Sequence, residues 1–260
     1  MNIVLVMSEA SLWKPQFVEG IIKTLSGAQQ VVGMVLTSFR PRKSSKWNHI
    51  RRYFIMLGFR VFFLMAVREI FHTIGDIIDR HIRLSKYHSI EGVCRRYDIP
   101  VFKSRNVNNK NTIDWIQQLS PDILLSSGNQ IFRKKLLSVS KIACLNRHTS
   151  LLPAYKGIYP IFWCLLNDEE FVGVSVHTMT AQIDQGKVVA QERLRVQEKD
   201  TFFSLFEKCF ELSVDVVCEA IDRAEKGELR AVESYYEDSY YSYPTRQDVK
   251  AFRRKGKRLL

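Results

Sequence analysis

Short apolar runs alternate with segments of helical periodicity over the first half of the chain. Residues 3–7 and 31–37 are apolar runs of strand length, and residues 15–25 between them carry apolar side chains at helical spacing. A helical stretch around 111–119 and the apolar run 122–126 continue the pattern. Strands that alternate with helices pair in parallel and have both sheet faces covered. The pattern therefore predicts an α/β fold with a Rossmann-like, mostly parallel sheet.

The turn after the first strand excludes one common ligand of such folds. A dinucleotide site needs a glycine-rich turn there, and residues 8–13 contain no glycine. After about residue 200 the pattern becomes helical. We predict a catalytic domain at 1–200, with a helical insertion at about 40–95. A short C-terminal helical extension and basic tail are predicted at 201–260.

The charge balance is strongly basic. Lys and Arg number 39 against 27 Asp and Glu, which leaves a net charge of +12. This charge favours anionic partners such as phosphates, nucleic acid or a membrane surface, without choosing among them. The five scattered cysteines form no CxxC pair, so we expect neither disulfides nor a metal site. The N-terminus predicts a strand rather than a secretory signal, and a cytoplasmic location is the default expectation.

Residues 53–71 form an apolar run that Arg60 and Arg68 interrupt. The run lacks the roughly 18–20 uncharged apolar residues of a membrane span. We interpret it as a buried helix, or as a homodimer-interface helix, inserted between strands. The alternative is a helix peripheral to a membrane, where the basic residues before it would meet anionic lipid. These basic residues are Arg40, Arg42, Lys43, Lys46, Arg51 and Arg52.

The tail combines tyrosines with a basic helix. Thr245 is placed to cap a helix, with Asp248 in a capping box, and several cations follow. We expect a solvated basic helix, with contact to a nucleotide diphosphate or anionic lipid as the alternative. The tyrosines before it favour interface packing, with stacking on a base or sugar as the alternative. They are Tyr235, Tyr236, Tyr240, Tyr241 and Tyr243.

Asn146 and His148 lie two residues apart in a stretch that begins as a strand, so their side chains leave from the same face. An amide donor beside a protonated imidazole can clamp an oxyanion. Pro153, Gly157 and Pro160 then predict an irregular loop where a ligand can meet exposed backbone.

Asp184 lies in a turn after a second strand, which the alternation at 173–179 predicts. A carboxylate near His148 would favour imidazolium over the neutral ring. Spacing alone leaves simpler interpretations open, since Asn-x-His is common at polar strand edges and Asp-x-Gly is common in turns.

Taken together, these motifs resemble the signature of the formyl transferase family. The matching residues are Asn146, His148, Ser150 to Pro153, Tyr155 and Gly157, then Gly173 to His177 with Met179, and Asp184 with Gly186. Upstream similarity at 121–132 extends the resemblance over about 120–190. It implies a formyltransferase fold and an enzyme that moves a formyl group from 10-formyltetrahydrofolate to a substrate amine.

The resemblance also implies roles for individual residues. Asn146 and His148 would stabilise the tetrahedral oxyanion, with His148 as proton donor. Asp184 would hold His148 protonated and help to remove the proton of the amine. His177 would have a structural role. The residues expected to border the folate are Gln130, Ile131 and Phe132, through backbone groups at the pterin, and Ser150, Leu151, Leu152 and Pro153.

Three residues depart from the family pattern: Arg147, Thr149 and Lys156. Arg147 follows a strand position whose side chain faces the reaction, so its own side chain should point away and leave catalysis intact.

The acceptor amine is inferred from what the chain lacks. The glycinamide ribonucleotide enzymes carry a glycine-rich phosphate loop after the first strand, and the tRNA enzymes usually add a C-terminal barrel. Neither is expected here, so we predict a small-molecule acceptor, namely a nucleotide-linked amino sugar. Three alternatives stay open: a methionyl-tRNA formyltransferase-like enzyme, a 10-formyltetrahydrofolate hydrolase that uses water, and a non-catalytic homologue that binds folate or a membrane.

Overall fold

The computed structural model describes residues 1–9, 13–37, 46–82, 87–128, 130–180, 182–233 and 236–260. Predictions that involve Arg40, Arg42, Lys43 or Tyr235 lie outside these ranges, as does part of the turn after the first strand.

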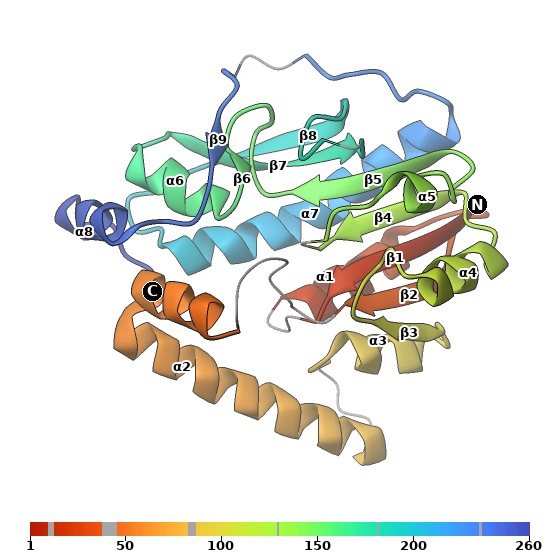
Figure 1. Ribbon diagram of the computed structural model, residues 1–260, viewed down its shortest axis with the longest axis horizontal. Helices are drawn as coiled ribbons and strands as arrows, with labels where there is room; N and C mark the ends of the chain where they lie inside the picture. Colours follow the sequence, from red (N-terminus) through yellow and green to blue (C-terminus); the bar gives the residue numbers. More distant parts are fainter. Residues whose placement is uncertain (10–12, 38–45, 83–86, 129, 181, 234–235) are drawn as a thin grey trace.

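A seven-stranded sheet runs through the molecule in the order β3-β2-β1-β4-β5-β7-β8 (Figure 1). The first five strands are parallel, and β7 is antiparallel to both of its neighbours. The prediction of a mostly parallel α/β sheet is therefore confirmed. The strands are β1 (Asn2–Ser8), β2 (Gln30–Thr37), β3 (Val101–Ser104), β4 (Ile123–Ser127), β5 (Ala143–His148), β7 (Phe171–Thr178) and β8 (Val188–Arg195).

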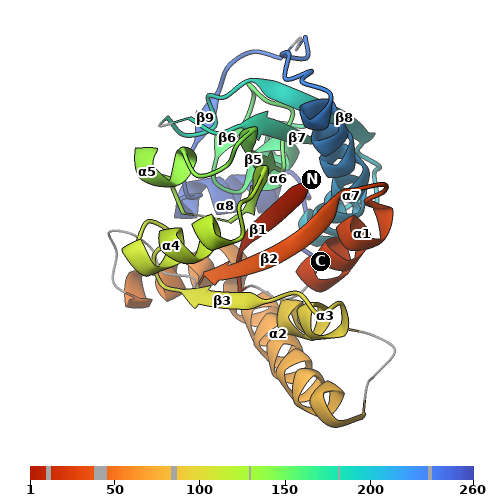
Figure 2. The same ribbon diagram turned by 90° about the vertical axis from the view of Figure 1, so that its right-hand side faces the viewer.

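Helices cover both faces of this sheet (Figure 2). On one face lie α1 (Lys14–Thr24) and α7 (Phe202–Glu225), and on the other lie α4 (Lys110–Gln118) and α5 (Lys134–Leu137). Alternate residues of β1 enter the two cores, because successive strand side chains point to opposite faces. Leu5 packs into the core on the α1 and α7 side, whereas Val6 packs into the core on the α4 and α5 side.

The C-terminal segment joins the same body. Thr201 caps α7 through a capping box with Ser204, and α7 packs on α1, β7 and β8. The predicted capping box of Thr245 and Asp248 is confirmed at the start of α8 (Arg246–Arg254). The domain boundary at residue 200 stays a prediction. Two further short helices are α3 (Ile90–Arg96) and α6 (Pro160–Leu166).

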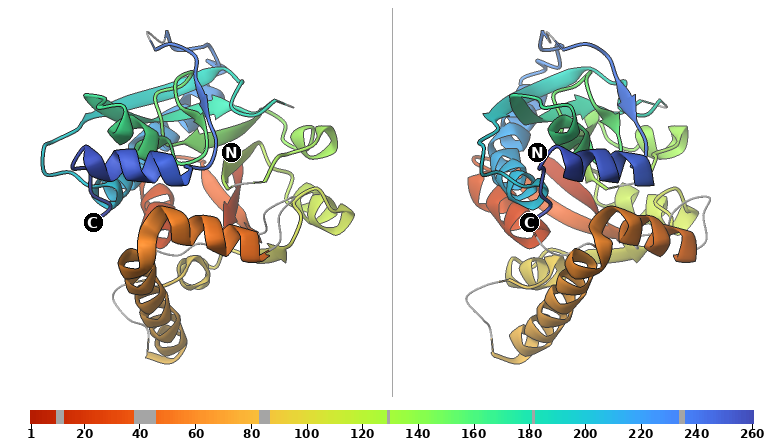
Figure 3. Two further views of the ribbon diagram at one scale, coloured as in Figure 1. Left: turned by 60° about the vertical axis from the view of Figure 1, so that its left-hand side comes forward. Right: turned by 90° about the vertical axis from the view of Figure 1, so that its left-hand side faces the viewer.

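The predicted insertion is dominated by α2 (Lys46–Ile82), which bends at Gly58 (Figure 3). The backbone of Gly58 has φ 72° and ψ 168°, a region that is essentially restricted to glycine. The half after the bend projects away from the sheet (Figure 2). Its polar side is fixed to α3, where Asp76 pairs with Arg95 and Asp79 pairs with Arg96.

The interpretation of 53–71 as a buried helix is wrong for one side of α2. Phe59 is 73% exposed and Phe71 is 67% exposed. The physical reason is that the ion pairs with α3 hold the helix by its polar side, which turns the apolar side outward. None of the described helices has an apolar stretch long enough to cross a membrane.

A two-stranded ladder ties the C-terminal segment to the loop that follows β5. The short strands β6 (Lys156–Gly157) and β9 (Tyr240–Tyr241) pair in parallel. The side chain of Tyr241 stacks on Tyr155, with ring centroids 5.1 Å apart. The C-terminal segment therefore helps to shape the loop that borders β5.

Candidate active site

Asn146 and His148 leave β5 on the face that is covered by α4 and α5, as their spacing predicts. Asn146 is in register with Ser126 of β4 on one side and with His177 of β7 on the other. Arg147 points to the opposite face, where its Nε donates a hydrogen bond of 2.7 Å to Ser213 of α7. The predicted orientation of Arg147 is confirmed.

His148 faces an acceptor at each ring nitrogen. Its Nε2 lies 3.0 Å from the carbonyl oxygen of Tyr155, and its Nδ1 lies 3.8 Å from Oδ2 of Asp184. A carbonyl only accepts hydrogen bonds, so Nε2 carries a proton. The distance of 3.8 Å is too long for a direct hydrogen bond, although it is close enough for strong electrostatic coupling.

Asp184 is aimed at His148 by a tight turn. Its own φ is 51°, in the left-handed region that aspartate tolerates better than most residues. Gly186 is required two residues later, because a Cβ there would lie 1.5 Å from the carbonyl oxygen of Thr178. The backbone N–H of Gly157 donates to Oδ2 of Asp184 at 3.1 Å. The Asp-x-Gly spacing thus fixes the carboxylate beside the loop that follows β5.

His177 connects Asn146 to Asp184. Its Nδ1 lies 2.9 Å from the carbonyl oxygen of Thr178 and therefore donates. Its Nε2 lies 3.1 Å from Nδ2 of Asn146 and 3.5 Å from Oδ1 of Asp184. In the neutral ring Nε2 accepts from the Asn146 amide, which orients that amide. Sequence reasoning gave His177 a structural role and missed this double contact, because it depends on the register between β5 and β7.

The pKa values follow from burial and these contacts. Burial alone would raise the pKa of Asp184, but its contact with the His177 ring, the neighbouring His148 and the Gly157 N–H outweigh burial and lower the pKa to about 2. Burial lowers the pKa of His148 below 6.5, and it prevails over the opposing effects of Asp184 and the Tyr155 carbonyl. Asp184 therefore acts in the predicted direction, yet it does not keep His148 charged near neutral pH in this state.

The first predicted folate segment lies at the carboxyl end of β4. The amide oxygen of Gln130 accepts from the backbone N–H of Val107 at 3.0 Å, and the carbonyl of Ile131 accepts from the side chain of Asn108 at 2.9 Å. Phe132 is buried in the core beneath α4 and α5. Asn108, which the sequence did not single out, therefore helps to hold this segment.

The second predicted folate segment is packed into the protein. The side chains of Ser150, Leu151 and Leu152 are buried. The hydroxyl of Ser150 donates to the carbonyl of Ala154 at 2.8 Å. Pro153, which is partly exposed, follows them. A ligand at this segment would meet its backbone and Pro153 more readily than the three buried side chains.

Ser126 is an additional candidate that sequence reasoning missed. Its side chain is 1% exposed, and its Oγ has no hydrogen-bond partner among the described residues. Buried hydroxyls without a partner are uncommon and costly. Ser126 is in register with Asn146, at the carboxyl end of β4, where open α/β sheets bind ligands. The unsatisfied hydroxyl fits a site that is completed by a polar ligand or a water molecule.

The described residues contain no group of three or more His, Cys, Asp and Glu side chains arranged to hold a metal ion. What the cluster offers chemically is an amide donor at Asn146, a buried imidazole at His148 and an ionised carboxylate at Asp184. An arrangement of this kind can stabilise a developing oxyanion and accept a proton at neighbouring positions.

Comparison with known proteins identifies relatives of the chain. A sequence model described as formyl transferase matches residues 78–221. The bifunctional polymyxin resistance protein ArnA of Wigglesworthia glossinidia brevipalpis is 32% identical over 190 residues, which cover 73% of this chain and 27% of that protein. The methionyl-tRNA formyltransferase of Thermotoga maritima is 28% identical over 154 residues, covering 59% of this chain and 49% of that protein. The chain thus spans about half the length of the latter and about a quarter of the former.

Solved structures agree on the fold. A sugar N-formyltransferase from Shewanella sp. FDAARGOS_354 superposes with a TM-score of 0.56 at 14% identity, covering 97% of this chain and 87% of that one. WlaRD, a sugar 3N-formyl transferase solved in the presence of dTDP and 5-N-formyl-THF, gives a TM-score of 0.56 at 16% identity, covering 93% of this chain and 69% of that one.

Proposed function

The chain belongs to the formyl transferase family, and we propose that it transfers a formyl group from 10-formyltetrahydrofolate to the primary amine of a nucleotide-linked amino sugar. The observation that carries the proposal is the convergence of three side chains on one face of β5. Asn146 and His148 leave the strand together, and Asp184 reaches within 3.8 Å of His148 from a distant turn.

The three residues supply the functions that formyl transfer needs. The folate co-substrate provides the formyl carbon, to which the amine nitrogen bonds as the bond to the folate nitrogen breaks. Asn146 donates its amide N–H to the formyl oxygen as negative charge develops there. Asp184 is ionised and His148 is neutral, with Nδ1 unprotonated. Together these two groups accept the proton that the amine loses. His148 then returns a proton to the departing folate nitrogen.

A separate observation supports folate binding at this site. Ser126 presents a buried hydroxyl without a partner among the described residues, in register with Asn146. The segments 130–132 and 150–153 would border the folate on either side. WlaRD was solved with 5-N-formyl-THF and shares the fold.

An amino-sugar acceptor is favoured by the relatives with sugar substrates. WlaRD is a sugar 3N-formyl transferase, and its structure was solved in the presence of dTDP. Methionyl-tRNA is the second candidate, because a methionyl-tRNA formyltransferase is 28% identical and the net charge of +12 suits a polyanion. Structures of sugar N-formyltransferases and of phosphoribosylglycinamide formyltransferases both superpose over most of this chain, but residues 8–13 lack the glycine-rich loop expected of the latter.

An acceptor panel tests the proposal. The protein is incubated with 10-formyltetrahydrofolate and, separately, with a set of amino-sugar nucleotides, formylatable methionyl-tRNA, or no acceptor. Release of tetrahydrofolate and the mass of the product are followed in each reaction. We expect release that depends on an amino-sugar nucleotide, with a mass gain of one formyl group on the sugar.

The other outcomes reject specific parts of the proposal. If methionyl-tRNA were formylated and no amino-sugar nucleotide were, the acceptor would be the tRNA and not the sugar. Folate release at the same rate without an acceptor would indicate hydrolysis. No turnover in any reaction, from protein whose folding is verified by circular dichroism, would reject the enzyme assignment.

A further inference from the structure

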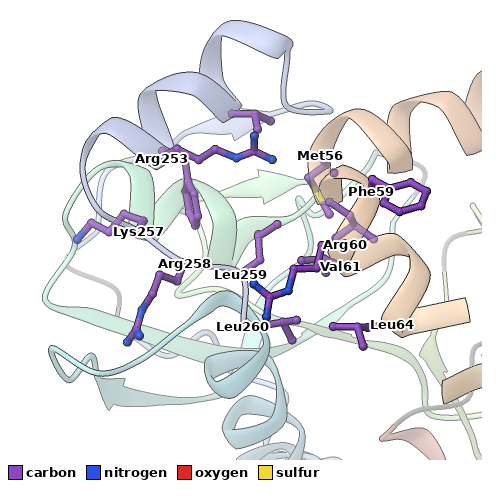
Figure 4. A pocket seen from close by; sticks show the side chains of 14 residues that line it. Met56, Phe59, Arg60, Val61, Leu64, Arg253, Lys257, Arg258, Leu259 and Leu260 are labelled. Carbon is purple, nitrogen blue, oxygen red and sulfur yellow. The ribbon is translucent and has the colours of Figure 1, made fainter. Parts of the chain in front are cut away.

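An open groove of about 490 Å³ lies between α2 and the C-terminal tail, and none of the candidate catalytic residues lines it (Figure 4). It forms where α2 bends at Gly58, and α8 with the residues after it makes the opposite wall. Much of the lining is apolar, including Met56, Phe252 and Leu259. Two segments about 200 residues apart in the sequence thus build one site.

Four cations line this groove: Arg60, Arg253, Lys257 and Arg258. Lys257 pairs with Asp168 at 2.7 Å. Arg60, Arg253 and Arg258 have no ion pair with any described residue, although Arg258 donates a hydrogen bond of 3.2 Å to the carbonyl of Lys199. No Asp or Glu is among the described residues that line the groove. The last residue, Leu260, also lines it, and a terminal carboxylate there would offset a single charge.

Arg253 is held at the bend of α2. A Cβ built on Gly58 would lie 2.9 Å from Nη2 of Arg253, so the guanidinium rests almost on the helix backbone. Figure 4 shows Arg253 reaching toward Met56 from α8, with Arg60 on the facing wall. Arg60 and Arg253 therefore approach the groove from opposite sides.

An exposed apolar stripe starts at the same place. It consists of the outward-facing side chains Phe59, Phe63, Ile70, Phe71, Ile74 and Ile77. At 100° per residue these positions fall within about 120° of the helix circumference. Phe59 belongs to both the groove and the stripe, so the two surfaces are continuous.

From this continuity we infer that the groove and the apolar stripe together form a binding site for the surface of an anionic phospholipid bilayer. Arg60 and Arg253 bind lipid phosphates, and the stripe enters the boundary between headgroups and acyl chains. A helix with an apolar face and cations at its edge has this geometry. The inference does not depend on formyl transfer.

A second copy of the chain suits the same surface less well. The stripe contains no acidic residue, because Glu69, Asp76 and Asp79 lie on other sides of the helix. A stripe that packs against its own copy would therefore leave Arg60 and Arg253 without counter-charge. An anionic bilayer supplies both the apolar phase and the negative charge.

Vesicle flotation of the full chain tests the inference. Vesicles of equal parts phosphatidylglycerol and phosphatidylcholine are compared with pure phosphatidylcholine. We expect binding to the anionic vesicles alone. The R60Q/R253Q variant should lower the partition coefficient about 25-fold, since each cation near an anionic surface contributes about fivefold. Phe63→Ser with Ile74→Ser should also weaken binding.

The matched control is K226Q/R230Q, which removes two exposed cations near the end of α7 and should keep binding within about twofold of the unchanged protein. If this control lost as much binding as R60Q/R253Q, the effect would be one of net charge alone, and the proposed bilayer site would be rejected. A stable dimer that the two serine substitutions dissociate, without flotation, would assign the stripe to a second copy. If the protein bound inorganic phosphate but did not float with vesicles, and R60Q/R253Q abolished that binding, the ligand of the groove would be a soluble phosphate and not a bilayer.

Discussion

The Oδ2 atom of Asp184 lies 3.8 Å from Nδ1 of His148, and each side chain is 10% exposed. We expect Asp184→Asn to lower kcat about 10²–10³-fold, because the substitution keeps the shape of the side chain and removes the charge that accepts a proton. The KM for 10-formyltetrahydrofolate should change much less. Initial rates with the acceptor identified in the panel measure both quantities.

Asp114→Asn is the matched control for this change. Asp114 is a carboxylate on α4 that pairs with the exposed Lys110, and it lies outside the candidate site. Its loss should leave kcat within about twofold and the fold intact, since exposed ion pairs contribute little. An Asp184→Asn protein that is as active as this control would show that the carboxylate takes no part in the reaction.

Acid should destabilise the fold through His148. Burial holds its pKa below 6.5, so between the two pKa values the unfolded chain binds more protons than the folded one. The free energy of unfolding therefore contains the full contribution of His148 above about pH 6.5. That contribution falls as the pH drops toward the folded pKa, by up to about 1.4 kcal/mol per pH unit. Urea unfolding at several pH values between about 7.5 and 5 measures the slope.

His148→Asn should flatten this part of the pH dependence. The low pKa of Asp184, about 2, places its own loss of stability in a separate window below about pH 4, so the two titrations do not overlap. Equal slopes in the unchanged protein and in His148→Asn would show that the imidazole titrates alike in the folded and unfolded chains.

Much of the fold follows from local sequence patterns. The apolar runs predict β1, β2 and β4 because a strand buried on both faces leaves few polar positions. The period of two places Asn146 and His148 on one face and Arg147 on the other, and the structure agrees. The Thr245 and Asp248 capping box is likewise predictable, because all of its hydrogen bonds lie within four residues.

The contacts that complete the site are not local. Nothing in the spacing of Asp184 brings it to His148, because that depends on the turn after β7 and on the loop at Gly157. The same limit applies to His177, which reaches Asn146 through strand register. The interpretation of 53–71 as a buried helix is based on apolar composition. Composition does not specify which side of α2 faces α3, and that side is set by the ion pairs between the two helices.

Ser126→Ala should separate a ligand contact from a structural one. The buried Oγ has no partner among the described residues, so its removal should leave the thermal stability of the ligand-free protein unchanged or slightly higher. If the hydroxyl binds the folate, the KM for 10-formyltetrahydrofolate should rise about 5- to 10-fold, as for one lost hydrogen bond. Thermal unfolding and initial rates give the two measurements.

Ser175→Ala provides the contrasting control on β7. Its hydroxyl is also buried, but it donates to the carbonyl of Ser150 and accepts from the backbone N–H of Leu152. Its loss should lower the free energy of unfolding by about 1–3 kcal/mol. If Ser126→Ala destabilised the protein as much as Ser175→Ala does, the Ser126 hydroxyl would already have a hydrogen-bond partner in the ligand-free protein. It would then not be reserved for a ligand.

Gly157→Ala should damage stability and activity together. The backbone of Gly157 has φ 98°, and an added Cβ would lie 2.2 Å from the carbonyl oxygen of Tyr241. The clash should separate β6 from β9 and withdraw the N–H that holds Asp184. We expect the free energy of unfolding to fall by at least about 2 kcal/mol and kcat to fall about 10-fold or more. Urea unfolding and initial rates measure the two effects.

Gly227→Ala isolates the cost of the backbone conformation from the cost of the contact. Gly227 has φ 73°, and nothing lies within 4 Å of an added Cβ. This substitution should cost about 1–2 kcal/mol for the left-handed backbone and leave kcat unchanged. If Gly157→Ala behaved like Gly227→Ala in both measurements, the ladder with Tyr241 would have no part in placing Asp184. A selective loss of kcat in Gly157→Ala would instead assign the C-terminal segment a positioning role at the reaction centre.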